Sequence, residues 1–407
     1  MRRVVITGAG AVSALGSTWE QVEARIRRGR NAVQRMPEWD RYEGLSTKLG
    51  APVPDFEVPA HWSRKQMRSM GRVAKFAVCS SERALESAGL LDDPVLTSGR
   101  TGVAYGSSAG SPDAITEFGD MRMNHSTSGL NATSYLRMMG HTTAVNIGVF
   151  FGLTGRVIPT SSACTSGSQG IGYAYETIAT GSQDVMVAGG AEELCATQSA
   201  VFDTLYATST INDSPESSPR PFDSGRDGLV IGEGACTLIL EEYERAKARG
   251  ATILCEIIGF ATNSDGKHVT RPNLATIESC LRMSLENAGV EADQVDYVSA
   301  HGTATPWGDV AESHATRAVL GAVPISAMKS YVGHTLGACG SLEAWWAIEM
   351  MRAGWFAPTV NLGTIDPECA ELDYITGTIR SLEAELVMSN NFAFGGINTS
   401  LLFRRLA

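Results

Sequence analysis

The feature that most constrains the fold of this chain is a short pattern that occurs once in each half. Within residues 82–110, a helical segment containing Leu-Glu-Ser-Ala-Gly leads to a strand-like run and then to a loop of small residues. Within residues 281–305, Leu-Glu-Asn-Ala-Gly leads to a strand-like run and a loop that begins with a histidine. Such an internal echo predicts a duplication, with two similar halves related by a pseudo-two-fold axis and their loops meeting at the centre.

Strand-like and helical runs alternate along the chain, and this alternation indicates an α/β fold. The expected strands are Val4–Thr7, Arg100–Tyr105, Val185–Ala188, Leu238–Glu241 and Ile253–Ile258, with a helix over Val73–Ala88. A chain of 407 residues fits one large domain or two fused halves.

Composition excludes several classes of protein. The net charge of −11 argues against a general nucleic-acid binder. No apolar run reaches the roughly 18 residues of a membrane span. The N-terminal MRRVVITGAGAVSALG has no cleavage site and is interpreted as a strand and turn rather than a signal peptide. The unpatterned cysteines then fit a reducing cytoplasm, and without CxxC or clustered Cys/His spacing no metal is expected.

Gly8-Ala-Gly10 after the first apolar run resembles the start of a dinucleotide-binding motif. The fingerprint is weak, because Ser13 stands where a third Gly or Ala would allow close helix packing. A tight turn after the first strand is the preferred interpretation.

Cys164 lies at the centre of the small-residue run Thr160–Gly167, and Ser168–Gly181 has the spacing of a helix. A thiol at a helix N-terminus feels the positive end of the helix dipole, which lowers its pKa and favours the thiolate. This arrangement suits a covalent nucleophile. The other seven cysteines are interpreted as small hydrophobic residues.

Two of the seven histidines, His301 and His334, lie in loops rich in Gly and Thr. A further glycine loop, Asn390–Asn398, can direct main-chain N–H groups at a ligand. One Cys with two His and no evident Asp partner is unlike a protease. It suits acyl transfer through a thioester, in which two imidazoles act where negative charge develops on a second carbonyl.

Together these motifs resemble the β-ketoacyl-ACP synthases, the condensing enzymes of the thiolase-like superfamily. The resemblance rests on Thr160-Ser-Ser-Ala-Cys164, His301-Gly-Thr-Ala-Thr-Pro306, Lys329 with Gly333-His334-Thr-Leu-Gly-Ala338, and Asn391-Phe-Ala-Phe-Gly-Gly396, in that order. It runs from Val4 to the C-terminus. It implies an α/β fold of duplicated βαβαβαββ halves in an α-β-α-β-α layering, with an N-terminal half over 1–250 and a C-terminal half over 251–407.

The resemblance also implies roles for individual residues. Cys164 would accept the acyl group, with its own N–H and that of Phe394 as the oxyanion hole, and His301 and His334 would hold the malonyl thioester carbonyl. Lys329 and Glu343 would form a supporting network, and Thr303 and Thr305 would hydrogen-bond the phosphopantetheine arm. Phe394 would also gate the pocket, and Asp309 and Glu312 would form a polar or cation site nearby.

Family resemblance implies partners as well. Charge alone predicts a solvated helix face at Arg64, Lys65 and Arg68. By the resemblance, these three residues match the cations on which the family docks the acidic acyl carrier protein. The substrates would be acyl-ACP and malonyl-ACP, with no organic cofactor. A homodimer is expected, and a heterodimer with a synthase-like subunit is possible.

Some positions depart from the family pattern. Trp307, Tyr331 and Ile397 are bulkier than the usual residues and would reshape the acyl or pantetheine channel. The alternatives are therefore a housekeeping fatty-acid synthase or a specialised ketosynthase of a polyene or polyketide pathway that acts with a chain-length partner. A thiolase is disfavoured because the last cysteine, Cys369, lies outside any glycine-rich loop. His334 argues against a type III synthase, and Cys164 against a non-enzymatic subunit.

Overall fold

A computed structural model describes residues 1–406, and its centre is one mixed sheet of 11 strands. In spatial order the strands are β13 (Asp373–Tyr374), β11 (Pro324–Ser326), β10 (Tyr297–Ser299), β15 (Leu386–Ala393), β16 (Ile397–Arg404), β9 (Cys255–Ser264), β1 (Val4–Ser13), β8 (Gly234–Glu242), β6 (Val185–Glu192), β4 (Thr101–Gly106) and β5 (Val157–Pro159). The short strands β2 (Gln34–Arg35), β3 (Leu49–Ala51), β7 (Ile231–Gly232), β12 (Trp355–Phe356) and β14 (Arg380–Ser381) form two small sheets.

The two ends of the large sheet repeat one another. Strands β5, β4 and β6 are parallel, and β8 and β1 continue antiparallel; likewise β11, β10 and β15 are parallel, and β16 and β9 continue antiparallel. Only three residue pairs join the two sets, from Val4↔Ile257 to Ile6↔Cys255. The repeat has the pseudo-symmetry that the sequence echo predicts.

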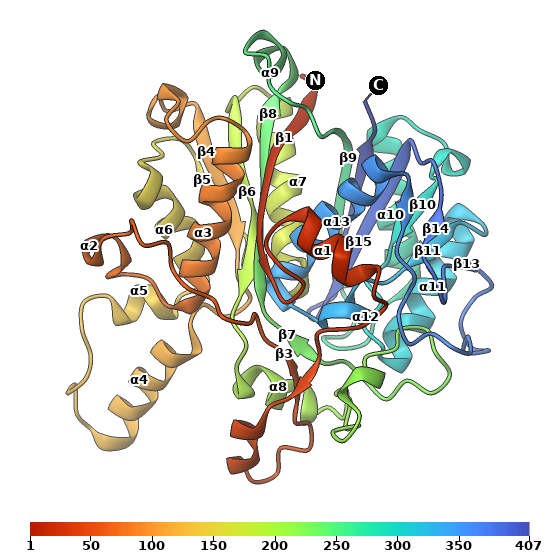
Figure 1. Ribbon diagram of the computed structural model, residues 1–407, viewed down its shortest axis with the longest axis horizontal. Helices are drawn as coiled ribbons and strands as arrows, with labels where there is room; N and C mark the ends of the chain where they lie inside the picture. Colours follow the sequence, from red (N-terminus) through yellow and green to blue (C-terminus); the bar gives the residue numbers. More distant parts are fainter. Residues whose placement is uncertain (407) are drawn as a thin grey trace.

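Helices cover and separate the two sets of strands (Figure 1). The outer helices on the N-terminal side are α3 (Arg72–Ser87) and α6 (Thr142–Phe151), the central pair is α7 (Ser166–Ala179) and α13 (Cys339–Ala353), and the outer helices on the C-terminal side are α10 (Leu274–Ala288) and α11 (Pro306–Leu320). Helix α13 is buried on all faces from Cys339 to Met351 because it lies between the two sets. The predicted α-β-α-β-α layering is confirmed.

The remaining helices lie at the periphery or shape the loops. They are α1 (Trp19–Ile26), α2 (Arg64–Met67), α4 (Pro112–Asn124), α5 (Ser134–Met138), α8 (Ala196–Asp203), α9 (Tyr243–Ala248) and α12 (Lys329–Val332). The proposed division of the chain near residue 250 falls in the segment between α9 and β9. Across residues 1–406, no helix combines the length and the apolar character needed to cross a membrane.

Strand β1 corrects one expectation from the sequence. It does not end in a turn at Gly8-Ala-Gly10 but continues to Ser13, with one register shift between Ile6 and Gly8. A Cβ on Gly10 would stand 2.3 Å from the Ser80 carbonyl oxygen, and one on Gly8 would stand 2.5 Å from that of Ala84. The glycines are therefore needed because α3 packs directly on this strand, not because the chain turns there.

Candidate active site

The loop before α7 presents the candidate nucleophile. Cys164 lies in a single 3₁₀ turn, Ala163–Thr165, that leads directly into α7. Ala163 has a φ of 51°, a left-handed conformation that is uncommon for a residue with a side chain. The expected position of the thiol at a helix N-terminus is therefore present, and the tight turn fixes its direction.

Burial reverses the expected shift in the acidity of this thiol. The Cys164 side chain is enclosed, and desolvation raises its pKa to about 11. The Lys329 charge and the N–H groups of Phe394 and Cys164 lower the pKa, but by less than burial raises it. The resting site thus holds a neutral thiol, contrary to the thiolate expected from the helix terminus alone. The same two N–H groups point at the sulfur, so they also lie beside the position of an acyl oxygen bonded through that sulfur.

Both histidines reach this thiol from the C-terminal half of the chain. His301 follows β10, and its own N–H and that of Gly302 each donate to the Glu312 carboxylate at 2.7 Å. His334 follows α12, and its Nε2 lies 3.0 Å from Cys164 Sγ. The two imidazole rings stand nearly perpendicular, with centroids 5.2 Å apart.

Hydrogen bonds fix the tautomer of each ring. His334 Nδ1 accepts from the Leu336 N–H at 3.2 Å. His301 Nδ1 faces two donors, Lys329 Nζ at 3.0 Å and Asn391 Nδ2 at 3.3 Å. Because Nδ1 accepts in both rings, the proton of each neutral imidazole lies on Nε2. Burial, together with the Lys329 charge, holds both histidine pKa values well below 6.5. The site therefore offers two neutral N–H donors.

A buried ion pair supports His301 from behind. Lys329 Nζ donates to Glu343 Oε1 at 2.6 Å and to the His301 carbonyl at 2.7 Å. Both side chains of the pair are almost completely inaccessible to solvent. Asn391 Nδ2 also donates to Glu343 Oε2, at 2.8 Å. The structure thus brings together four predicted residues, Lys329, Glu343, His301 and His334, around the thiol.

Two residues of this centre were not singled out from the sequence. Asn391 begins one of the motifs that carry the family resemblance, but the sequence assigns it no role of its own; in the structure it bridges His301 and Glu343. The sequence predicts Cys339 to be a small hydrophobic residue, yet its Sγ donates to the Cys164 carbonyl at 3.2 Å. The only local signal was their sequence proximity to Phe394 and to His334.

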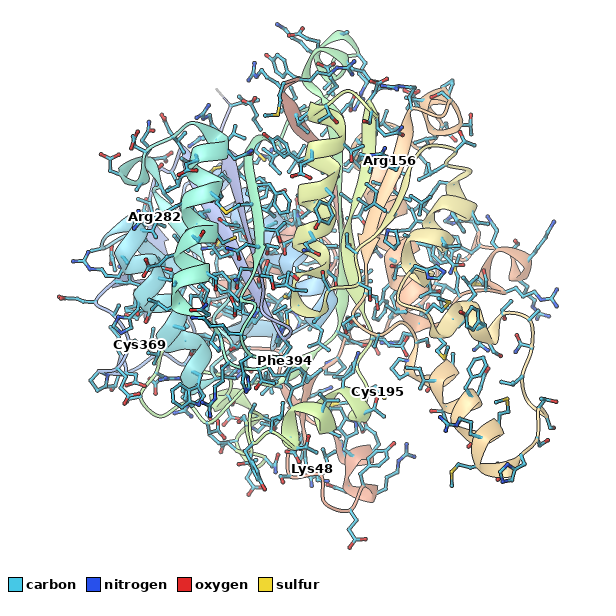
Figure 2. All side chains as sticks on the ribbon, turned by 180° about the vertical axis from the view of Figure 1, so that it is seen from behind. Lys48, Arg156, Cys195, Arg282, Cys369 and Phe394 are labelled. Atoms are coloured by element: carbon cyan, nitrogen blue, oxygen red, sulfur yellow. The ribbon has the colours of Figure 1, made fainter. Side chains whose placement is uncertain are left out.

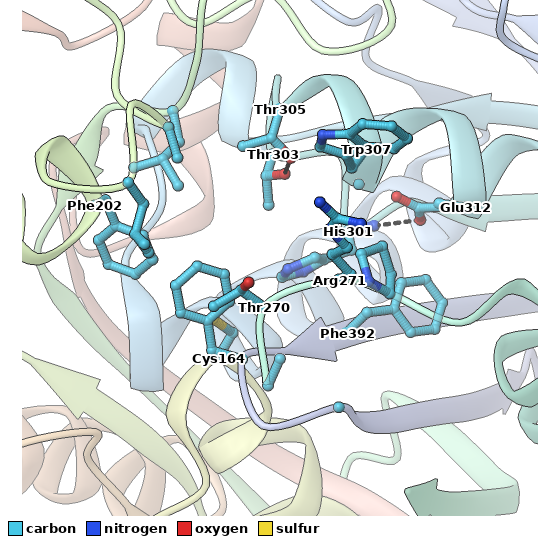
Figure 3. A pocket seen from close by; sticks show the side chains of 18 of the residues that line it. Cys164, Phe202, Thr270, Arg271, His301, Thr303, Thr305, Trp307, Glu312 and Phe392 are labelled. Atoms are coloured by element: carbon cyan, nitrogen blue, oxygen red, sulfur yellow. Dashed lines mark hydrogen bonds between the residues drawn. The ribbon is translucent and has the colours of Figure 1, made fainter. Parts of the chain in front are cut away.

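A cavity of about 330 Å³ connects this centre to the surface. Thr303 and Thr305 line it, with their hydroxyls 2.9 Å apart, and Figure 3 shows both at the side of the cavity away from Cys164. Phe394 lines it too and packs on Phe202, with ring centroids 4.9 Å apart. Figure 2 places Phe394 near the middle of the molecule, at the end of β15.

Asp309 and Glu312 do not present free carboxylates for a cation. Asp309 accepts from the N–H groups of Phe222, Thr303 and Ala304, at 2.8–3.1 Å. Glu312 accepts from the two N–H groups of the His301 loop. Burial raises their pKa values, to about 6 for Asp309 and to about 8 for Glu312. Both carboxyls serve to hold the loop that carries His301, Thr303 and Thr305.

Three donor atoms of the centre could in principle hold a metal ion. The ligand atoms of Cys164, His301 and His334 lie within 4.8 Å of one another, and thiolate with imidazole is a donor set that zinc accepts. The buried Lys329 ammonium opposes a second positive charge at this point. That no metal is used stays a prediction.

The other residues predicted from the sequence lie apart from the centre. Arg64, Lys65 and Arg68 are exposed at the short helix α2, at the outer left of Figure 1, and none lines the cavity. Their role in docking stays a prediction. Tyr331 is buried in the core and does not reshape the channel, whereas Trp307 does line the cavity.

Two family models and a full-length relative match this chain. Residues 1–246 match the family model of the β-ketoacyl synthase N-terminal domain, and residues 254–363 match that of the C-terminal domain. The chain is 37% identical over 412 residues to 3-oxoacyl-[acyl-carrier-protein] synthase 1 of Escherichia coli K12, covering all of both chains.

Two solved structures extend the comparison. A β-ketoacyl synthase from Burkholderia phymatum STM815 is 60% identical, with a TM-score of 0.99 and full coverage of both chains. The ishigamide ketosynthase/chain length factor is 30% identical, with a TM-score of 0.91 and full coverage of both chains.

Proposed function

This chain belongs to the β-ketoacyl synthase family, and we propose that it is a 3-oxoacyl-[acyl-carrier-protein] synthase that elongates acyl chains by decarboxylative Claisen condensation. It is accordingly an acyltransferase of the condensing type. The observation that carries the proposal is the convergence of Cys164, His301 and His334 in one cavity, with an N–H of each neutral imidazole available to a substrate oxygen.

In the first step, Cys164 Sγ attacks the thioester carbonyl of acyl-ACP. The tetrahedral oxyanion receives hydrogen bonds from the N–H groups of Cys164 and Phe394. When the intermediate collapses, the bond to the carrier thiol breaks. The proton of Cys164 ends on that thiol, so acylation consumes no net proton. The thiol that is neutral at rest therefore loses its proton as the new C–S bond forms, and the departing carrier thiolate takes that proton up.

In the second step, malonyl-ACP places its thioester carbonyl against the two Nε2–H groups. The bond to the malonyl carboxylate breaks, CO₂ leaves, and the electron pair forms an enolate whose oxygen accepts from His301 and His334. The enolate carbon then attacks the acyl-enzyme carbonyl and expels Cys164 as thiolate, which takes up one proton from solvent to restore the resting thiol. Neutral donors suit this task, because they stabilise the enolate oxygen without protonating the reactive carbon.

The partners of the reaction follow from the same proposal. Acyl carrier protein docks on Arg64, Lys65 and Arg68, three exposed cations on an enzyme of net charge −11. The protein forms a homodimer. Strand β5 is one of the two edge strands of the large sheet, and Val157 on it and Val149 on α6 leave apolar surface uncovered. A single peak at twice the chain mass in light scattering is the expected result.

A specialised ketosynthase that needs a chain-length partner is the second candidate, because the ishigamide ketosynthase/chain length factor has the same fold. The identity of 37% to 3-oxoacyl-[acyl-carrier-protein] synthase 1, against 30% to the ishigamide protein, favours the first candidate. Product formation by the purified protein alone, without any second subunit, separates the two.

The test of the proposed function is intact-mass spectrometry with acyl-ACPs followed by malonyl-ACP. We expect an acyl adduct that disappears as β-ketoacyl-ACP forms. Cys164→Ala should abolish the adduct and the condensation while retaining decarboxylation of malonyl-ACP, because both imidazoles remain. His334→Ala should lose decarboxylation. Full decarboxylation by the His334 variant would refute the assigned role.

A further inference from the structure

Two residues at the rim of the cavity have no part in the chemistry above. Trp307 is 71% exposed, which is unusual for so large an apolar side chain, and it lines the cavity. Arg271 lines the cavity as well, and its guanidinium lies over the Trp307 ring, 5.7 Å from the centroid. The two come from segments far apart in the sequence, so their pairing is a tertiary feature of this cavity.

Trp307 marks the outer end of one cavity wall. His301, Thr303, Thr305 and Trp307 line the cavity at every second position of one segment. His301 is buried, the two threonines are half-buried, and Trp307 is exposed. In Figure 3, Trp307 lies beside the threonines and away from Cys164. A flexible substrate arm that reaches Cys164 past the threonines therefore enters beside Trp307.

Arg271 is held at this entrance but is not neutralised there. His268 Nδ1 accepts from the N–H groups of Thr270 and Arg271, at 3.1 and 3.2 Å, and ties the turn that carries the guanidinium. The Val269 carbonyl accepts from the Gly395 N–H at 2.8 Å, which joins this turn to the Phe394 loop. Within residues 1–406, no carboxylate lies within ion-pair distance of Arg271. The guanidinium is left with all its donors free.

The entrance also carries the N-terminus of α11. Trp307 and Gly308 are in the first turn of this 15-residue helix, where main-chain N–H groups have no acceptor within the helix. An arginine fork beside a helix N-terminus is a combination that binds phosphate. The arm that enters here, on the function proposed above, is phosphopantetheine, which bears one phosphodiester at the end remote from its thiol.

We propose that Arg271, held by stacking on Trp307, binds the phosphate of the phosphopantetheine arm at the cavity entrance, and that this pair makes the enzyme select phosphorylated thioester donors. The inference rests on the proposed function. It assigns the bulk of Trp307 to positioning Arg271 rather than to narrowing the acyl channel.

The experiment compares acyl donors that carry the same acyl chain. They are acyl-pantetheine, acyl-phosphopantetheine and acyl carrier protein, and the rate of Cys164 acylation by each is followed by intact mass. For the unaltered protein, we expect kcat/KM to favour the phosphorylated small donor about tenfold or more over the unphosphorylated one. The preference should shrink in 0.5 M NaCl, because the guanidinium is exposed.

Arg271→Gln should bring the ratio of the two small donors near one, mainly by raising KM for the phosphorylated donor. Trp307→Ala should lower the same ratio without any change of charge. Lys267→Gln is the matched control, because Lys267 is an exposed cation of the same loop that does not line the cavity. Its ratio should stay at the value of the unaltered protein.

Three results would overturn the inference. They are a ratio near one in the unaltered protein, an equal loss for both small donors in Arg271→Gln, and a loss confined to the carrier-bound donor, which would assign Arg271 to the protein surface of the carrier. A wrong proposed function would give a different result in the same assay. Cys164 would then acylate with its phosphate preference intact, yet no β-ketoacyl product would form from malonyl-ACP.

Discussion

Breaking the buried Lys329–Glu343 pair should destabilise the protein strongly, and removing both partners should restore much of the loss. Either single change, Lys329→Met or Glu343→Leu, leaves one ionisable group buried without its counter-charge. Lys329→Met also removes the two bonds from Lys329 Nζ to His301, and so changes the surroundings of the thiol. Glu343→Leu leaves the donor of both bonds in place. The variants conserve side-chain volume, so the effect reports on charge rather than on a cavity.

The expected fall in Tm follows from the burial of the pair and the length of the chain. Removing one partner of a fully buried pair costs about 3–5 kcal/mol. The entropy of unfolding is about 2.1 cal/mol/K per residue, and for 407 residues this is about 0.85 kcal/mol/K. The two figures predict a fall in Tm of about 4–6 °C for each single variant. The double variant should fall by less than either single, because an apolar pair of similar volume is often as stable as a buried ion pair.

Differential scanning calorimetry of the three variants and the unaltered protein gives the comparison. Arg405→Met is a matched control, because it breaks an exposed pair with Glu383 and should shift Tm by less than about 1 °C. If the double variant loses as much as the two single variants added together, the two groups are not coupled and the reasoning is wrong.

Three further predictions address the thiol, the docking helix and the first strand. Because burial raises the pKa of Cys164 to about 11, its alkylation rate should increase about tenfold per pH unit from pH 7 to pH 10, and a plateau below pH 9 in peptide mass spectrometry would contradict this. Lys65→Glu with Arg68→Glu should raise KM for acyl-ACP and leave Cys164 alkylation intact, whereas unchanged kinetics at low salt would exclude docking there. Gly10→Ala should destabilise by about 1–3 kcal/mol in thermal unfolding, because its Cβ would meet the Ser80 carbonyl oxygen, and an unchanged Tm would count against the close packing of α3.

The site residues that could be predicted from the sequence are those whose neighbours along the chain form a recognisable pattern. Small residues flank Cys164, His301 and His334, and glycine among them allows the backbone to approach a ligand closely. Asn391 and Cys339 carry no such signal. Their contacts with His301 and with the Cys164 carbonyl arise only when β15 and α13 meet in the fold.

Two expectations failed because a tertiary effect outweighed a local one. The Lys329 charge and two main-chain N–H groups lower the pKa of Cys164, but desolvation raises it more strongly. The glycines of β1 favour a turn when considered alone, yet they lie in a strand because α3 covers them. Neither burial nor the approach of a distant helix can be obtained from a window of a few residues.

The two ends of the sheet divide the chemistry between them. The thiol comes from the N-terminal set of strands and helices, whereas His301, His334, Lys329 and Glu343 all come from the C-terminal set. On the proposed function, the covalent step and the charge-stabilising step therefore draw on separate halves of the repeated architecture. A lineage that lost the thiol would keep a complete carbanion-generating half, so selection can act on one activity without dismantling the other.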